Sequence, residues 1–217
     1  GKSTMMKILA GLLEYDDGWV DNKPSVSYKP QHIDVDMDCS VQLWLDSEIG
    51  AKWRSGEFNV NVIKALGVDQ LLPKRVKKLS GGERQAVSIA ICLGRDADLY
   101  LLDEPSAHLD ANARMEAAKA IRKTMESNEK SALVIDHDVY FIDILSDSLL
   151  VFEGDGGHYG KATGPYSLRD GMNRFLKGVN ITFRRDHDSK RPRINKLESR
   201  KDREQQSSGD FYSFESK

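Results

Sequence analysis

The chain has 217 residues and a formal net charge of −2, with 39% hydrophobic and 30% charged residues. This balance is typical of a globular protein, and the length suffices for one buried core plus an appendage. The sequence holds no apolar run near the roughly 18 residues of a membrane span and no opening signal peptide, so any membrane domain is expected on another chain.

The chain opens on a candidate phosphate-binding loop. Gly1, Lys2, Ser3 and Thr4 match the last four residues of a P-loop, and helically spaced apolar residues follow over 3–13. In such a loop, backbone N–H groups and a helix N-terminus surround the phosphates, the lysine reaches the β- and γ-oxygens and the serine hydroxyl binds Mg²⁺. A plain helix start is the alternative. We expect the loop glycines and the preceding strand upstream, so that this chain is a fragment.

The next elements alternate between strand and helix in a way that predicts a parallel sheet covered on both faces. Strands are expected at 26–28, 99–102, 132–135 and 148–152, and helices at 111–125, 139–145 and 167–176. A mostly helical block over about 40–95 interrupts this alternation and is interpreted as an inserted subdomain. Residues 153–164 are rich in glycine and polar residues and are expected to form a loop.

Within the helical block, a glycine pair stands where a helix begins. Ser80 and Glu83 fit a capping box, which is a sufficient structural reason for both. Gly81 and Gly82, however, weaken a first helical turn by up to about 1 kcal/mol each relative to alanine. They leave bare N–H groups at a positive helix end, which predicts an anion site.

Two adjacent carboxylates close the strand expected at 99–102. Asp103 is predicted to hold Mg²⁺ and Glu104 to orient and polarise an attacking water. Neighbouring strand residues point to opposite faces, so the two carboxylates cannot share one task. A strand that merely ends in an acidic turn is the structural alternative.

Two further features concern cysteine and charge. Cys39 and Cys92 are far apart and in no C-x-x-C pattern, so neither a metal cluster nor a disulfide framework is predicted, and Cys92 is expected in the core. Residues 182–203 contain nine basic and four acidic residues, about +5, which leaves about −7 elsewhere. This asymmetry fits a polyanionic partner or an acidic docking surface, and equally a solvated tail. Beyond Asp186 we expect extended structure that orders only against a partner.

Taken together, these motifs resemble the ATP-binding-cassette (ABC) ATPases. The resemblance rests on the order of four elements: Leu79-Ser80-Gly81-Gly82-Glu83, Leu102-Asp103-Glu104-Pro105, Ala107-His108-Leu109-Asp110 and an isolated His137. It implies an α/β P-loop NTPase fold with a mainly parallel sheet flanked by helices, an ABC-type helical subdomain and a basic C-terminal tail. The family usually continues its signature with arginine where this chain has Ala86.

The family resemblance also assigns roles to residues. Gln31 is expected to sense Mg²⁺ and the attacking water, His137 to contact the γ-phosphate, and Asp110 to cross to the partner cassette. Mg²⁺ would be held by Ser3, Gln31 and Asp103. One ATP would be served by Lys2, Ser3, Thr4, Gln31, Asp103, Glu104 and His137, and the ATP of the opposite half-site by Ser80, Gly81, Gly82 and Glu83.

Longer stretches resemble one subfamily. Residues 96–110, 134–143, 171–176 and 181–196 are similar to the second cassette of ABC subfamily E, the ribosome-recycling ATPases of archaea and eukaryotes, also called RNase L inhibitor homologues. The resemblance implies a cytoplasmic, membrane-free twin-cassette protein whose missing N-terminal part carries iron–sulfur clusters. Its expected partners are its own first cassette, the ribosome (small subunit and ribosomal RNA) and termination or recycling factors. Residues 1–178 would form the nucleotide-binding domain and 179–217 a basic hinge segment.

Three other interpretations were weighed. An ATPase subunit of a membrane transporter would share every core motif but would not need residues 181–196. A chromosome or DNA-repair ATPase would need a long heptad insertion between Gln31 and Ser80, which is not there. A non-enzymatic binding protein is disfavoured by Glu104. Without the P-loop glycines, the chain alone is expected to bind nucleotide weakly.

Overall fold

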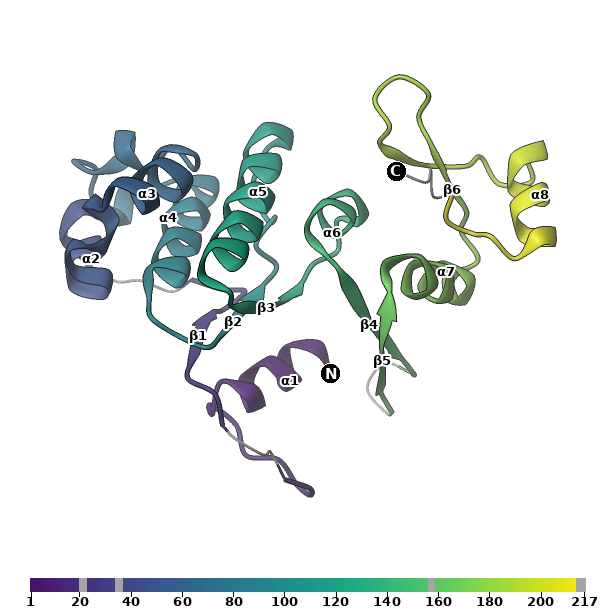
Figure 1. Cartoon of the computed structure of the whole chain (residues 1–217), viewed down its shortest axis with the longest axis horizontal. Coiled ribbons are helices and arrows are strands. Elements are labelled where there is room, and N and C mark those ends of the chain that lie inside the picture. The colour runs from purple at the N-terminus through teal and green to yellow at the C-terminus, as the bar shows by residue number, and fades with distance from the viewer. Residues whose placement is uncertain (20–22, 34–36, 156–158, 214–217) are drawn as a thin grey trace. The chain divides into compact units, whose positions relative to one another are not determined.

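The computed structural model describes residues 1–19, 23–33, 37–155 and 159–213. The chain forms two compact units, residues 2–141 and residues 142–217, with Gly1 grouped with the second. Figure 1 gives the order of the elements along the chain. All the predicted site residues except Gly1 belong to the first unit.

The first unit is built on a three-stranded parallel sheet. Its strands are β1 (Val26–Lys29), β2 (Leu99–Asp103) and β3 (Ser131–Ile135), with β2 in the middle. The register pairs Lys29 with Leu102 and Asp103 with Ile135, so all three strands end at the same edge. The predicted parallel arrangement is confirmed, and it brings the residues that follow each strand to one crevice.

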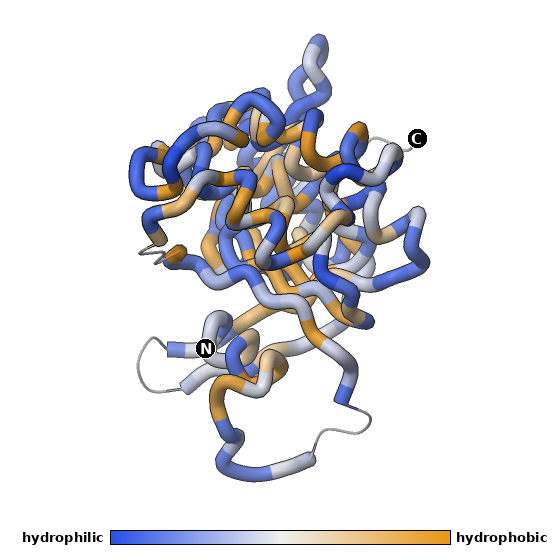
Figure 2. Tube along the Cα trace, turned by 90° about the vertical axis from the view of Figure 1, so that its left-hand side faces the viewer, coloured by the Kyte–Doolittle hydropathy of each residue, from blue (hydrophilic) through white to orange (hydrophobic). Residues whose placement is uncertain are grey.

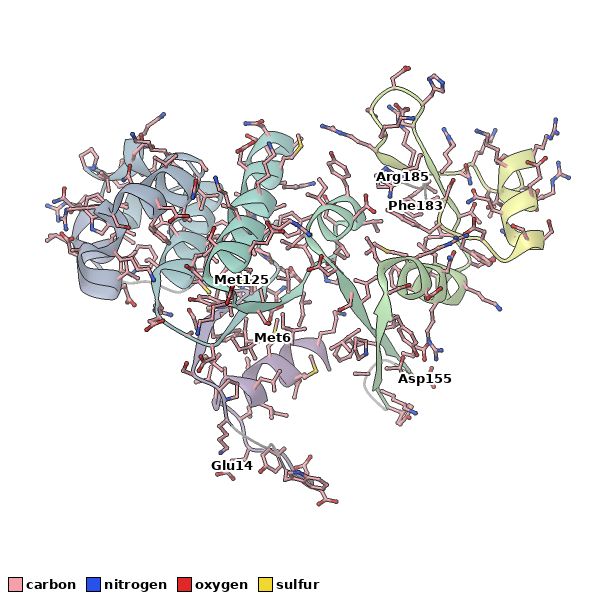
Figure 3. The ribbon with its side chains drawn as sticks, in the orientation of Figure 1. Met6, Glu14, Met125, Asp155, Phe183 and Arg185 are labelled. Carbon is pink, nitrogen blue, oxygen red and sulfur yellow. The ribbon has the colours of Figure 1, made fainter. Side chains whose placement is uncertain are left out.

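Helices cover both faces of this sheet. From α1 (Lys2–Leu9), the buried Met6 packs with Leu101 and Ile135 on one face (Figure 3). On the other face, Ser27 donates a hydrogen bond of 2.8 Å to the carbonyl of Cys92 in α4 (Gly81–Gly94). Cys92 is buried, as expected for a small apolar side chain. Figure 2 shows how apolar and polar stretches alternate along the chain.

The predicted first helix is shorter than expected. It was predicted over 3–13, but α1 ends at Leu9, because Gly11 adopts a φ of 71° and its N–H turns back to the carbonyl of Ile8. A glycine in the left-handed region is a common helix stop.

Helices and short helical turns fill residues 41–94. Their bounds are α2 (Val41–Ile49), α3 (Gly56–Phe58), 3₁₀ turns at Gly50–Arg54, Val68–Leu71 and Val76–Lys78, a π-helical turn at Asn59–Lys64, and α4. Ser40 starts α2 by accepting a hydrogen bond of 3.3 Å from the N–H of Leu43. After β2, α5 (Ala111–Asn128) leads back to β3, and α6 (Val139–Leu145) follows.

The second unit corrects two predictions. The strand expected at 148–152 does not extend the parallel sheet: β4 (Ser148–Glu153) pairs antiparallel with β5 (Lys161–Ser167). Most of β5 falls within the predicted loop 153–164, of which residues 156–158 lie outside the described residues. The sequence concealed this strand because it contains glycine and proline and most of its side chains are exposed. The next helix, α7, spans Leu168–Val179.

The prediction of extended structure beyond Asp186 was also wrong. Strands β6 (Phe183–Arg185) and β7 (Pro192–Ile194) form an antiparallel hairpin, and α8 (Arg200–Ser208) follows. A polar network orders this segment from within: Asn195 donates to Thr182 at 2.9 Å, and Thr182 donates to the buried Asp202. The basic composition of the segment hid these contacts, since each involves an uncharged polar side chain.

Candidate functional site

The carboxylate of Asp103 is buried at the end of β2. The residue is 1% exposed, and neither side-chain oxygen has a hydrogen-bond partner among the residues that the structure describes. Burying a carboxylate is costly unless a cation or donors compensate it. An orphaned buried carboxylate therefore fits the predicted Mg²⁺ ligand.

The described residues contain no group of three or more His, Cys, Asp or Glu side chains placed to hold a metal ion by themselves. Mg²⁺ commonly binds one or two carboxylates and completes its shell with substrate phosphates and water. A single buried Asp103 matches that mode.

Lys29 lies against the backbone of Asp103, and the sequence did not reveal it. The residue is 1% exposed, and its Nζ donates to the carbonyl oxygens of Asp103 at 3.0 Å and Pro30 at 3.1 Å. Burial lowers the pKa of Lys29 to about 8, against the opposing effect of nearby acidic groups that include Asp103. These bonds join the end of β2 to the loop that contains Gln31. In the sequence, Lys29 is marked by nothing but its place directly before Pro30.

Glu104 meets His137 at the same edge of the sheet. The Nε2 atom of His137 lies 2.9 Å from Oε1 of Glu104, and the imidazole is 68% exposed whereas the carboxylate is 23% exposed. Both residues line a small depression together with Ser106, Arg114 and Asp136. The sequence prediction had named both residues separately, and the structure brings them together.

The backbone of Glu104 is unusual. Its φ is 47°, in the left-handed region, which costs a non-glycine residue roughly 1–2 kcal/mol. The N–H of Glu104 donates to the carbonyl of Ile135 at 2.7 Å, and its carbonyl accepts from the side chain of Gln85 at 2.6 Å. Non-glycine residues in this conformation are concentrated at functional sites.

Asp136 organises the loop that carries His137, and it too was missed. Its carboxylate accepts hydrogen bonds from the N–H groups of His137 at 2.8 Å and Asp138 at 2.9 Å, and from the hydroxyl of Ser106 at 2.7 Å. Asp138 in turn pairs with Arg114 at 2.6 Å. The sequence signal is an acidic residue on each side of the histidine.

The glycine pair packs against the turn at residues 108–110. The helix α4 begins with the predicted capping box: Ser80 accepts from the N–H of Glu83 at 3.3 Å, and Glu83 accepts from the N–H of Ser80 at 2.9 Å. A Cβ on Gly82 would lie 2.8 Å from the carbonyl oxygen of His108, and one on Gly81 would lie 3.3 Å from its ring. Glycine is therefore needed for this close approach as well as for exposed N–H groups.

A surface depression joins these two motifs. Ser80, Gly81, Gly82 and Glu83 line it together with Asp110 and Ala86. Asp110 is the N-cap of α5 and accepts from the N–H groups of Asn112 at 2.9 Å and Ala113 at 2.8 Å. Lys74 donates to Glu83 at 2.6 Å, and this bond lowers the pKa of the Glu83 carboxyl.

The remaining predicted residues lie at the start of the chain. Lys2, Ser3 and Thr4 form the first turn of α1, where Lys2 and Thr4 are exposed and Ser3 is half-buried. Gly1 directly precedes the helix. A lysine and two hydroxyl side chains at a helix N-terminus suit phosphate binding.

Fold and site define the class. A parallel sheet that ends in a buried aspartate, a Glu–His pair and a helix that begins with two glycines are the features of an ABC-type ATP-binding domain. The sequence model of the family described as "ABC transporter" matches residues 1–107.

Similar proteins narrow this class of ATP-binding domain to one family. "Translation initiation factor RLI1" of Saccharomyces cerevisiae is 43% identical over 98% of this chain, which spans 35% of that protein. "ABC transporter E family member 3" of Arabidopsis thaliana is 38% identical over 64% of this chain and 81% of its own length. In the crystal structure of the complex of archaeal ribosomal stalk protein aP1 and archaeal ribosome recycling factor aABCE1, one chain superposes with a TM-score of 0.92 at 49% identity, covering 99% of this chain and 41% of that one.

This chain belongs to the E family of ABC proteins. It spans about a third of the yeast relative's length. Among the described residues, no helix is long and apolar enough to cross a membrane.

Proposed function

We propose that this chain is the second ATP-binding and ATP-hydrolysing cassette of a twin-cassette ATPase that separates ribosomal subunits after translation termination. The similarity to a ribosome recycling factor carries the proposal, because it extends over 99% of the chain and includes the second unit. A transporter subunit would share the core motifs but would not need residues 181–196.

In the proposed mechanism, Lys2, Ser3 and Thr4 hold the phosphates of one ATP. Bound Mg²⁺ supplies charge compensation for the phosphates, and Ser3, Gln31 and Asp103 are the residues to hold it. The carboxylate of Asp103, buried and without a hydrogen-bond partner among the described residues, supports this role.

Glu104 orients and polarises the attacking water by accepting its hydrogen bond. His137, 2.9 Å from Glu104, contacts the γ-phosphate and keeps the carboxylate aimed at the water. The Asp136 network fixes the backbone of His137, so the histidine is presented in one orientation.

Ser80, Gly81, Gly82 and Glu83 serve the ATP of the opposite half-site, where the N–H groups of α4 face the γ-phosphate. Asp110 crosses toward the other cassette beside them. Two ATPs between two cassettes favour a closed state, and hydrolysis releases it.

Closure drives the ribosomal subunits apart in the cytoplasm. The partners are the first cassette of the same chain, the small subunit with its ribosomal RNA, and termination or recycling factors. Residues 1–178 act as the nucleotide-binding domain and 179–217 as a basic hinge segment near RNA. The iron–sulfur clusters belong to a preceding part of the protein.

The test uses the full-length protein with Glu104→Gln. The variant is expected to bind ATP and split ribosomes once, while single-turnover hydrolysis at this site falls by about 10²–10⁴-fold. Subunit separation is followed by sedimentation and hydrolysis by phosphate release. Unchanged hydrolysis at this site, or intact ribosomes after ATP binding by the unaltered protein, would overturn the proposal.

A further inference from the structure

We infer that Gln85 is a positioning residue that holds Glu104 through its backbone and links helix α4 to the hydrolysis site. The inference rests on the proposed role of Glu104 in hydrolysis. It concerns a buried side chain that acts through another residue.

The hydrogen bond between them is short and shielded from solvent. Gln85 is 2% exposed, and its Nε2 donates to the carbonyl oxygen of Glu104 at 2.6 Å. The same oxygen receives the N–H of Ala107 at a longer 3.3 Å. On the other side of the residue, the N–H of Glu104 donates to Ile135 at 2.7 Å. The two peptide groups of Glu104 are thus anchored to two different elements.

Glu104 needs such anchoring because of its conformation. With a φ of 47°, its backbone is in a region that L residues leave unless surrounding contacts hold it. Rotation toward an ordinary φ would swing the side chain away from His137, which lies 2.9 Å from the carboxylate. Losing the Gln85 amide leaves the carbonyl with the weaker Ala107 bond alone, so the direction of the carboxylate becomes less defined.

The position of Gln85 in α4 gives the bond a second consequence. The first turn of this helix carries Ser80, Gly81, Gly82 and Glu83, proposed to meet the ATP of the opposite half-site, and Gln85 lies in the next turn. A shift of α4 when that ATP binds is therefore transmitted to Glu104 through one hydrogen bond. Gln85 would couple occupancy of one half-site to the alignment of the carboxylate in the other.

The same helix offers a matched control. Ser88 is 7% exposed, and its hydroxyl has no hydrogen-bond partner among the described residues. Ser88→Ala therefore perturbs the buried face of α4 without removing a bond to the site. Gln85→Met keeps the length and volume of the side chain and removes the donor.

The experiment measures single-turnover hydrolysis, ATP affinity and the thermal unfolding midpoint of the full-length protein. The variants are Gln85→Met, Ser88→Ala, Glu104→Gln and the double variant Gln85→Met/Glu104→Gln. We expect Gln85→Met to slow hydrolysis about 10- to 100-fold with ATP affinity within about threefold of the unaltered protein. Ser88→Ala should hydrolyse normally. Because Gln85 acts through Glu104, the double variant should be no slower than Glu104→Gln alone.

The outcomes distinguish a failure of the inference about Gln85 from a failure of the proposed function. If Glu104→Gln slows hydrolysis but Gln85→Met does not, the inference about Gln85 is wrong and the proposed function stands. Additive losses in the double variant would likewise overturn the inference. If Glu104→Gln leaves hydrolysis unchanged, the proposed function itself fails. Should Gln85→Met not fold, Gln85→Leu removes the donor at a similar side-chain volume and is expected to show the same loss.

Discussion

The Nε2 atom of His137 lies 2.9 Å from Oε1 of Glu104, although 33 positions separate the two residues in the sequence. The parallel pairing of β2 with β3 accounts for this, since Asp103 is in register with Ile135 and each site residue follows its strand by one or two positions. The sheet therefore creates the pair, and the Asp136 network holds the histidine in place.

This pair predicts the effect of His137→Ala. In the full-length protein, hydrolysis at this site should fall by about 10²-fold, as for removal of one group that stabilises transition-state charge, while ATP affinity changes little. His187→Ala is the control, because this imidazole is 98% exposed in the hairpin. Phosphate release and ATP titration measure both quantities. An equal loss in the two variants would contradict a specific role for His137.

The packing of the glycine pair predicts the effect of Gly82→Ala. The new Cβ would meet the carbonyl oxygen of His108 at 2.8 Å, and a backbone atom cannot move aside cheaply. To make room for the methyl group, α4 and the 108–110 turn must move apart. We therefore expect the free energy of unfolding to fall by about 1–3 kcal/mol and ATP-driven closure to become slower. Gly56→Ala is the control, because a Cβ there meets nothing within 4 Å. Urea denaturation of both variants tests this, and equal midpoints would refute it.

The sequence predicted some of the site residues because a strand's carboxyl end and a helix N-terminus each leave a local pattern. Asp103, Glu104 and Ser80 could be found in this way. Lys29 and Gln85 could not, since each contributes through a bond from its side chain to a carbonyl 74 or 19 positions away, and no local pattern records such a bond.

The second unit was harder to predict for a related reason. Its order depends on polar contacts between distant residues, such as the two hydrogen bonds of 2.6 and 2.7 Å from Arg185 to Asp143 (Figure 3 labels Arg185). The composition of residues 182–203 indicated only charge. A basic, apolar-poor segment looks disordered in sequence whether or not its polar groups pair with one another.

A pH dependence follows from Asp98. Its carboxylate accepts from the hydroxyl of Ser25 at 2.7 Å and from Lys130 at 2.9 Å, and these bonds, the Ser25 bond first, lower its pKa to about 2. A lowered pKa in the folded state stabilises the protein above the unfolded value of roughly 3.9, and this contribution is lost as the pH falls toward about 2. Asp98→Asn should therefore be less stable than the unaltered protein near neutral pH, with the difference shrinking below about pH 4.

Urea midpoints of the unaltered protein and the variant, measured between neutral pH and pH 3, test this expectation. Asp96→Asn removes a charge from the same turn and serves as the control. Its stability difference from the unaltered protein should not shrink below about pH 4 in the same way. A difference for Asp98→Asn that stayed constant over the acid range would show that the ionised carboxylate is not the source of the stabilisation.

The polar network of the second unit predicts the cost of Asn195→Ala. Asn195 is 5% exposed, donates to Thr182 at 2.9 Å and to Gln205, and accepts from Arg184 at 3.1 Å. Removing it leaves buried polar atoms unpaired, which costs about 1–3 kcal/mol. Because the network lies within residues 182–205, protection of α8 amides from hydrogen exchange should fall while that of α4 stays the same. Lys201→Ala, an exposed change in α8, should leave both unaltered. Equal protection of α8 in Asn195→Ala and the unaltered protein would mean that something other than this network orders the segment.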